Sequence, residues 1–248
     1  MSITFEHPTN ELIRSLLRIE KLFLDLDQSL RFFQEKNLPL MLVASIIRLL
    51  ERPDLKLKLT NLLNQQYLHL KSYINNPQIE PKKLSDMLDR VERRLNLLRS
   101  NHSLSNLMPG SHLLIKKYQT EIMSHGATAL NSDPLLFAWE NLDNAAATKL
   151  LSEWRLELDQ LYSVVGLVLE LIRSSQSFKT IKCNSNFYSQ SINSDYNLIR
   201  LILPVETVPE FSASRHHMAL RFKQVKFTSS GVQLLDTDVK EFDISFCF

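Results

Sequence analysis

Residues 216–223 read His216-His217-Met218-Ala219-Leu220-Arg221-Phe222-Lys223, and this stretch decides the fold class of the C-terminal part of the chain. Its apolar side chains recur at every second position, which is the period of a strand with one face on a core and the other in water. A strand is also predicted over residues 198–203, where Pro204 ends it, and residues 242–248 alternate as Phe242, Ile244, Phe246 and Phe248 against Asp243, Ser245 and Cys247. This alternation predicts an antiparallel sheet with one solvated face.

Residues 1–175 carry a different period. Apolar side chains from Leu12 to Phe33 recur at three- and four-residue spacing, and Pro8 suits the first turn of the helix that this spacing predicts. A second helix is predicted over residues 39–51, because the residue before Pro53 avoids the helical region. Asp54 is expected to cap a third helix, which residues 75–77 end.

The helical period continues to residue 175. One stripe has nearly heptad spacing for about two heptads and predicts a bundle seam: Leu84, Met87, Leu88, Val91, Leu95 and Leu98. Residues 101–110 are expected to form a loop, and a further helix to run from Ser111 to His125-Gly126. Residues 135–139 are too short a run to assign from their period. A pair of helices is predicted from Asp143 or Asn144 to Ser175, with a break near Asp159.

These periods predict an α+β protein, in which a mostly helical part is followed by a small antiparallel sheet. Residues 3–6 also read as a strand and are expected to join that sheet, which would tie the two ends of the chain together. The predicted domains are an N-terminal strand over residues 1–8, a helical domain over residues 9–178 and a β-strand domain over residues 179–248.

Composition argues against several classes of protein. The chain has 248 residues and only 4 glycines, whereas average usage of about 7% would give roughly four times as many. Phosphate-binding loops need glycine where the backbone approaches a ligand closely, so no nucleotide cofactor is expected. Two cysteines without metal-ligand spacing fit a reducing compartment. No signal peptide or membrane-spanning run is found, and we expect a cytoplasmic protein without membrane insertion.

No group of residues predicts catalysis or a metal site. His216 and His217 are adjacent, so on a strand their side chains point to opposite faces and cannot hold one ion together. An acidic run near the C-terminus lacks the glycine that a calcium loop needs, and a solvated face explains it better: Asp236, Asp238, Glu241 and Asp243. We therefore expect no cofactor, no metal and no enzymatic activity, and a protein that acts by binding another protein.

Basic residues are the feature that suggests a partner. Arg14 and Arg18 lie four residues apart on one predicted helix face, and a second group falls in the predicted sheet: Arg200, Arg215, His216, His217, Arg221, Lys223 and Lys226. Between residues 200 and 226 only Glu206 and Glu210 oppose this charge. The group is either an ordinary solvated surface or a groove for an acidic segment. Nucleic acid is the alternative partner, but a net charge of +2 supports it weakly and none is expected.

Several short motifs, in order, resemble one known family. They are Phe5-Glu6-His7-Pro8 with Asn10-Glu11, then Leu17-Arg18-Ile19-Glu20, Leu169-Glu170-Leu171-Ile172-Arg173, Asn186-Phe187-Tyr188, Leu198-Ile199-Arg200-Leu201 and Ala219-Leu220-Arg221-Phe222. With these motifs the chain resembles the ZapD family, FtsZ-associated proteins of bacterial cell division. The resemblance covers nearly the whole chain and is weakest over residues 75–160.

The resemblance implies a homodimer whose subunits each have a helical and a β-strand domain. It also implies binding to the C-terminal tail of FtsZ and crosslinking of FtsZ filaments at midcell. Family binding relies on basic surface residues, which the motifs match to Arg18 and Arg221; Arg173 and Arg200 also lie in matching motifs. Where relatives have basic residues before Ala-Leu-Arg-Phe, this chain has Arg215-His216-His217, and a neutral histidine would weaken that contact near pH 7.

Overall fold

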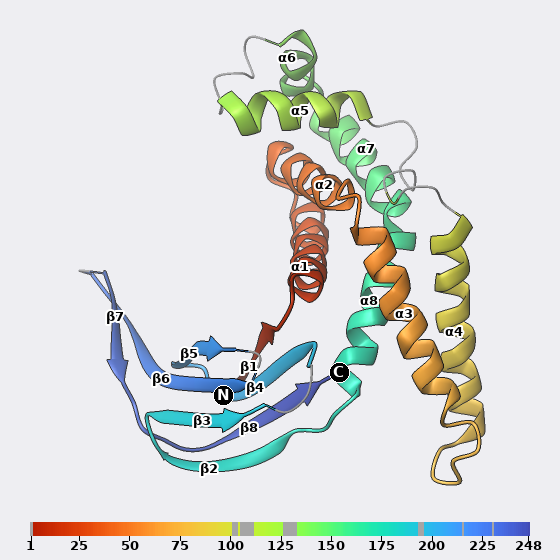
Figure 1. Cartoon of the computed structure of the whole chain (residues 1–248). Coiled ribbons are helices and arrows are strands. Elements are labelled where there is room, and N and C mark those ends of the chain that lie inside the picture. Colours follow the sequence, from red (N-terminus) through yellow and green to blue (C-terminus); the bar gives the residue numbers. More distant parts are fainter. Residues whose placement is uncertain are drawn as a thin grey trace. The chain divides into compact units, whose positions relative to one another are not determined.

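The computed structural model describes residues 2–100, 104, 112–125, 133–192, 196–214, 216–229 and 231–248. Its contacts divide the chain into two compact units (Figure 1). The first unit comprises Met1–Arg14 and Glu170–Phe248, and the second comprises Ser15–Leu169. Helices precede antiparallel strands along the chain, so the predicted α+β class is confirmed.

The first unit contains two antiparallel sheets. One sheet has the order β1-β4-β8-β2, formed by β1 (Ser2–Pro8), β4 (Leu198–Pro204), β8 (Val239–Cys247) and β2 (Lys179–Ser185). The other has the order β3-β6-β5, formed by β3 (Phe187–Ser191), β6 (His217–Thr228) and β5 (Thr207–Ala213), with β7 (Gly231–Asp236) also paired to β6. The β1–β4 register runs from Ser2 opposite Pro204 to Pro8 opposite Leu198. The N-terminal strand therefore joins the sheet, as predicted.

The core of the first unit consists of alternate side chains from both sheets. β4 contributes Ile199, Leu201 and Leu203, and β6 contributes Met218, Leu220 and Phe222. Phe242 of β8 lies against the ring of Phe222, with 5.1 Å between centroids. The strands thus form a two-layered sandwich, in which the period-two pattern of each strand gives one core face.

The prediction that one face of β8 is exposed to solvent is wrong at the C-terminal end of this strand. Ser245 and Cys247 are buried, and the Ser245 hydroxyl donates a 3.0 Å hydrogen bond to the carbonyl of Gln176. The Cys247 thiol lies against the carbonyl of Arg173, in the last turn of α8 (Asp159–Ser174). The chain leaving α8 therefore covers this face, which a strand pattern alone does not reveal.

Pro8 belongs to β1 and not to a helix, so this part of the prediction is also wrong. Its backbone is held opposite Leu198, and α1 (Glu11–Arg31) begins only after Asn10. The Asn10 side-chain oxygen accepts a 3.0 Å hydrogen bond from the amide of Ile13, which is the usual action of an N-cap.

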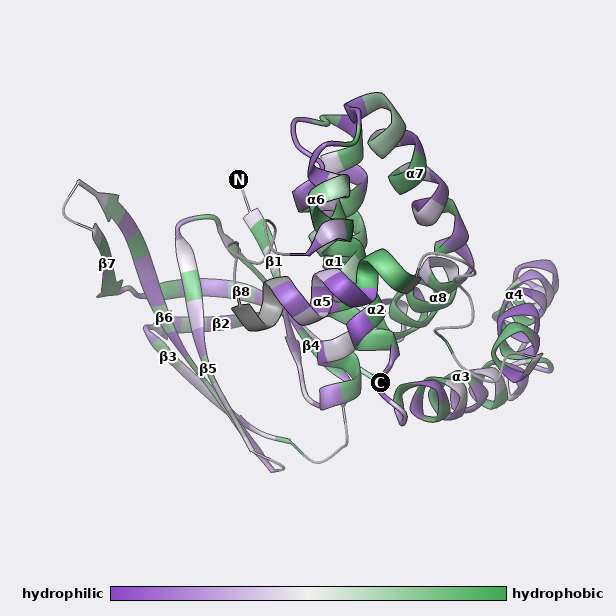
Figure 2. Ribbon diagram, turned by 90° about the horizontal axis from the view of Figure 1, so that it is seen from above, coloured by the Kyte–Doolittle hydropathy of each residue, from purple (hydrophilic) through white to green (hydrophobic). Residues whose placement is uncertain are grey.

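The second unit consists of helices. It contains α2 (Asn37–Leu50), α3 (Leu55–Lys71), α4 (Pro81–Ser100), α5 (His112–His125), α6 (Pro134–Glu140) and α7 (Asn144–Glu157), together with most of α1 and α8. α2 is apolar along most of its length, whereas α4 has one apolar stripe on a polar helix (Figure 2). α4 packs against α3 with four buried side chains of the predicted seam, Leu84, Val91, Leu95 and Leu98.

Aspartates at three helix starts behave differently. Asp133 accepts hydrogen bonds from the amides of Leu135 and Leu136, so the unassigned run 135–139 is a helix with a side-chain cap. Asp143 caps α7 in the same way. Asp54 occupies the N-cap position of α3, as predicted, but its carboxylate pairs with Lys58 at 2.5 Å and bonds no amide of the first helical turn. The predicted break near Asp159 is confirmed, since α7 ends at Glu157 and α8 begins at Asp159. Of the predicted loop 101–110, only residue 104 lies within the described residues.

Candidate partner-binding surfaces

Two of the predicted arginines converge on one carboxylate in the first unit. Arg173 donates to Glu6 through Nε at 2.8 Å and Nη2 at 2.7 Å, and Arg200 donates through Nε at 3.1 Å. The three side chains are only 27%, 19% and 19% exposed for Arg173, Glu6 and Arg200. Arg200 also donates to the carbonyl of Arg173 and lies over the ring of Phe178.

This cluster ties together the end of α8 and the neighbouring strands β1 and β4. Glu6 and Arg200 are directly opposite in the β1–β4 register, so the sheet itself places their side chains on one face. Their hydrogen-bonding groups are directed at each other and at backbone. Arg173 and Arg200 therefore stabilise the fold, and a part in partner binding stays a prediction.

Arg200 and Arg221 lie on opposite sides of the sandwich. Arg200 is flanked on β4 by the core residues Ile199 and Leu201, and Arg221 is flanked on β6 by Leu220 and Phe222. Because neighbouring side chains of a strand point to opposite faces, each arginine points outward from its own sheet. Arg200 and Arg221 thus do not share one surface.

Arg221 lies on the outer face of the second sheet. Its side chain is exposed, and its direct neighbours across the sheet are Phe187 of β3 and Glu210 of β5. Among the described residues, no hydrogen bond or salt bridge of the Arg221 side chain is found. Lys223, two residues along the same face, pairs with Asp236 at 2.7 Å. This hydrogen bond is the main cause that lowers the pKa of Asp236 below its ordinary value, and Arg221 adds a smaller electrostatic contribution.

The predicted histidines lie at the start of the same strand. His217 is exposed and pairs with Ser191 at the end of β3, and His216 is exposed in the bend before β6. By alternation, His217 shares the outer face with Arg221. Arg215 lies outside the described residues.

Arg14 and Arg18 have different surroundings although both belong to α1. Arg14, in the first unit, pairs with Glu11 at 2.8 Å, and both side chains are about 60% exposed. Arg18, in the second unit, is exposed and forms no hydrogen bond or salt bridge within the described part of the chain.

Arg18 contributes to a hollow that we call the α1–α2 basic hollow. Its volume is about 500 Å³, and its lining residues are Arg18, Ser45, Arg48, Leu49 and Arg52. Arg52 is held in place by a 3.1 Å hydrogen bond from Nη1 to the buried hydroxyl of Ser15 on α1. Three guanidinium groups and no carboxylate line it, so the lining of the hollow is basic.

Arg48 and Arg52 line this hollow but are not predicted as site residues from the sequence. In the sequence, Arg52 stands out only as the residue before Pro53, where it marks the end of a helix. A signal was present, because Arg48 and Arg52 are four residues apart near the end of α2. Their proximity to Arg18 depends on the packing of α2 against α1, which no local pattern contains.

Other kinds of site find no support in the described residues. No group of three or more His, Cys, Asp and Glu side chains is arranged to hold a metal ion in this part of the chain. No described helix is long and apolar enough to span a membrane.

Comparison with known proteins identifies the family. The family model for ZapD, a cell division protein, matches residues 17–221. The chain belongs to the ZapD family. ZapD of Coxiella burnetii is 32% identical over 231 residues, which cover 89% of this chain and 88% of that protein. ZapD of Cupriavidus metallidurans is 27% identical, with 90% of both chains covered. ZapD of Shigella flexneri is 26% identical, with 89% of this chain and 90% of that protein covered.

ZapD membership confirms the predicted family and its non-enzymatic role in cell division. The matched segment contains both exposed arginines, since it begins one residue before Arg18 and ends at Arg221. The lining residues of the α1–α2 basic hollow and Arg221 thus lie within the matched segment, whereas Lys223 and Asp236 of the second sheet lie beyond it.

Proposed function

We propose that this ZapD protein binds the C-terminal tail of FtsZ and, as a homodimer, crosslinks and bundles FtsZ filaments. It would act in the cytoplasm, be recruited to midcell, and stabilise the Z-ring during assembly of the division septum. The observation that carries the proposal is that Arg18 and Arg221 are exposed, and that neither side chain has a hydrogen bond or salt bridge among the described residues. An arginine that serves only the fold resembles Arg173, whose donors are directed at Glu6.

The α1–α2 basic hollow suits a carboxylate-bearing peptide. The exposed guanidinium of Arg18 is a planar donor for carboxylates, and Leu49 gives the hollow an apolar wall. A disordered tail that orders as it binds loses conformational entropy, so each single attachment should be weak. Exposed ion pairs contribute about 0.2–1 kcal/mol each. Charge therefore contributes more to the specificity for the partner than to the affinity.

Dimerisation would turn weak binding into bundling. Every subunit of a filament repeats the tail, and a dimer offers two copies of each surface. Linked attachment of this kind can strengthen binding by ~10²–10⁴-fold without a new contact. Two filaments that bind one dimer are crosslinked, so bundling follows from the number of sites.

Nucleic acid is the less supported partner. The basic strand region is divided between opposite faces of the sandwich, Lys223 is neutralised by Asp236, and Glu210 faces Arg221 across the sheet. Duplex binding needs several phosphate contacts on one face. Absence of a DNA mobility shift at low salt would remove this alternative.

Sedimentation of FtsZ polymers tests the proposal. We expect the protein to pellet with full-length FtsZ polymers and not with polymers that lack the C-terminal tail. Arg18→Glu and Arg221→Glu should each reduce co-pelleting severalfold, whereas Arg31→Glu on the same helix as Arg18 and Lys240→Glu on β8 should not. No co-pelleting with full-length FtsZ would refute the proposal, and equal co-pelleting without the tail would refute tail binding.

The homodimer needs a separate measurement. Sedimentation equilibrium should give twice the mass of the 28.8 kDa chain. A monomer at micromolar concentration that still bundles filaments would contradict the mechanism based on two copies of each surface.

A further inference from the structure

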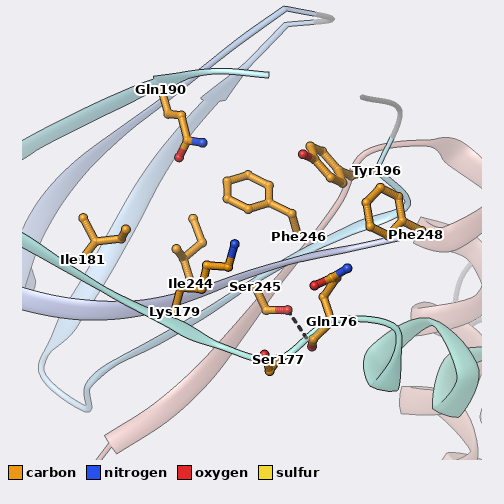
Figure 3. A pocket seen from close by; sticks show the side chains of 10 residues that line it. All are labelled: Gln176, Ser177, Lys179, Ile181, Gln190, Tyr196, Ile244, Ser245, Phe246 and Phe248. Carbon is orange, nitrogen blue, oxygen red and sulfur yellow. Dashed lines mark hydrogen bonds between the residues drawn. The ribbon is translucent and has the colours of Figure 1, made fainter. Parts of the chain in front are cut away.

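A pocket at the open edge of the sandwich shares no lining residue with the α1–α2 basic hollow and does not include Arg221. It has a volume of about 240 Å³ and belongs wholly to the first unit (Figure 3). Its lining residues come from β2, β3, β8 and the segments beside them: Gln176, Ser177, Lys179, Ile181, Gln190, Tyr196, Ile244, Ser245, Phe246 and Phe248. β2 and β3 are the edge strands of their sheets, so the pocket opens where the two layers of the sandwich separate.

The interior of the pocket is apolar because it reaches the sandwich core. Ile244 belongs to that core, and Ile181 and Phe246 pack against it. Tyr196 continues the wall, with its ring 4.9 Å from Phe246 and 5.1 Å from Phe248 between centroids. Aromatic and aliphatic walls of this kind favour an apolar group over water.

The rim of the pocket is positively charged. Lys179 is the one lining residue whose side chain is charged at neutral pH. It is exposed and forms no salt bridge within the described part of the chain. The Gln190 side-chain oxygen accepts a 2.6 Å hydrogen bond from the Tyr188 hydroxyl, which leaves the amide nitrogen as a donor. The rim can thus meet a carboxylate and a peptide carbonyl.

The volume limits what can enter. Sites for drug-sized ligands and cofactors have volumes of about 300–1,000 Å³, and this pocket is smaller. We infer that it receives one apolar side chain of an acidic peptide, whose neighbouring carboxylate pairs with Lys179. The inference rests on the proposed function, because the acidic peptide it names is the FtsZ tail. It adds an apolar anchoring site to the basic residues proposed for the same partner.

Binding of a labelled synthetic FtsZ tail peptide to the full chain tests the inference. Lys179→Glu should weaken binding about fivefold at low salt, because an attraction becomes a repulsion. Ile181→Phe, which fills the pocket, should weaken it about tenfold or more, as expected when a whole apolar side chain is excluded. The matched control is Lys182→Glu, since Lys182 lies on the same strand but does not line the pocket.

Methyl NMR reports occupancy directly. The δ1-methyl signals of Ile181 and Ile244 should shift when the tail peptide is added, and should not shift with a peptide whose apolar residues are replaced by serine while its acids are kept. If the tail peptide binds the wild type while the Lys179 and Ile181 variants bind equally well, the pocket is not its site and the proposed function stands. If the serine-substituted peptide shifts both methyl signals equally, the apolar anchor is refuted. Failure of the tail peptide to bind the wild type at all would overturn both.

Discussion

Replacing Glu6 by glutamine isolates the charge that holds Arg173 and Arg200 together. Glutamine keeps the length and most of the shape of the side chain, so cavity formation contributes little. The change leaves two guanidinium groups, 27% and 19% exposed, facing each other across an uncharged amide. Arg200 keeps its bond to the Arg173 carbonyl and its position over Phe178, and the expected loss is therefore that of the counter-ion.

The structure sets the size of the loss. Removing one partner of a fully buried ion pair costs about 3–5 kcal/mol, and fully exposed pairs contribute about 0.2–1 kcal/mol. Glu6 makes three charge-assisted hydrogen bonds and is 19% exposed, so it lies closer to the buried case. We expect Glu6→Gln to lower the free energy of unfolding by about 2–3 kcal/mol. Glu11→Gln, which affects a pair about 60% exposed, should cost less than about 1 kcal/mol.

Urea denaturation can show which of the two units loses stability in the Glu6→Gln variant. Both tryptophans, Trp139 and Trp154, are buried in the helical unit, so their emission follows that unit, whereas far-UV circular dichroism follows strands and helices together. We expect Glu6→Gln to move the circular dichroism transition to lower urea, with a smaller change in tryptophan emission if the units unfold separately. A free energy of unfolding within about 0.5 kcal/mol of wild type would refute the reasoning. Such a result would also mean that Glu6 does not hold Arg173 and Arg200 in place, so both arginines could bind a partner.

Two further predictions concern His7 and Asp133. Burial of His7 in a stack on Phe211, and secondarily the charge of Arg14, lower its pKa below its ordinary value. The unfolded chain therefore takes up a proton at His7 more readily than the folded chain as pH falls below about 6.5. The melting temperature should drop more between pH 7.5 and 5.5 for wild type than for His7→Gln. Parallel curves of melting temperature against pH would contradict this. Asp133→Ala should destabilise the helical unit by about 0.5–2 kcal/mol through loss of the α6 cap. Asp133→Asn should lose less stability than Asp133→Ala, because asparagine keeps a capping oxygen although it loses the 2.9 Å ion pair with Lys117. Thermal melts followed by tryptophan emission measure the stability of both variants. Equal losses of stability would show that the ion pair contributes more than the cap.

The period of the apolar residues was enough to predict the elements but not the layers. Met218, Leu220 and Phe222 are buried as their alternation indicates. The same rule fails at Ser245 and Cys247, because the backbone that follows α8 covers them and buries small polar side chains that look solvated in sequence. Pro8 illustrates a second limit. Proline suits the start of a helix and the end of an edge strand equally well, and only pairing with Leu198 decides between them.

The candidate binding surfaces are harder to predict than the fold for a physical reason. Charge summed along residues 200–226 suggests one basic surface, but a strand separates neighbouring side chains and a sandwich separates its two outer faces. Arg200 and Arg221 therefore have different environments although both lie in apolar strands. Arg48 and Arg52, in contrast, join Arg18 only through the packing of two helices, so their contribution depends on tertiary structure.

These environments explain why some arginines stabilise the fold while others stay exposed to a partner. Arg200 lies opposite Glu6 across a strand pair and forms an ion pair with it. The carboxylate offsets most of the cost of removing the guanidinium from water, so Arg200 can be partly buried and stabilise the fold. Arg221 faces Phe187 on one side and Glu210 on the other, without a bond to either, so it keeps its donors available at the cost of contributing little to stability. Because one such exposed cation binds weakly, a protein that uses it must combine several sites. In the proposed dimer, the hollow with its three arginines and the strand face with Arg221 would each be present twice. We therefore expect filament bundling to weaken more than proportionally when the charges of Arg18 and Arg221 are both reversed.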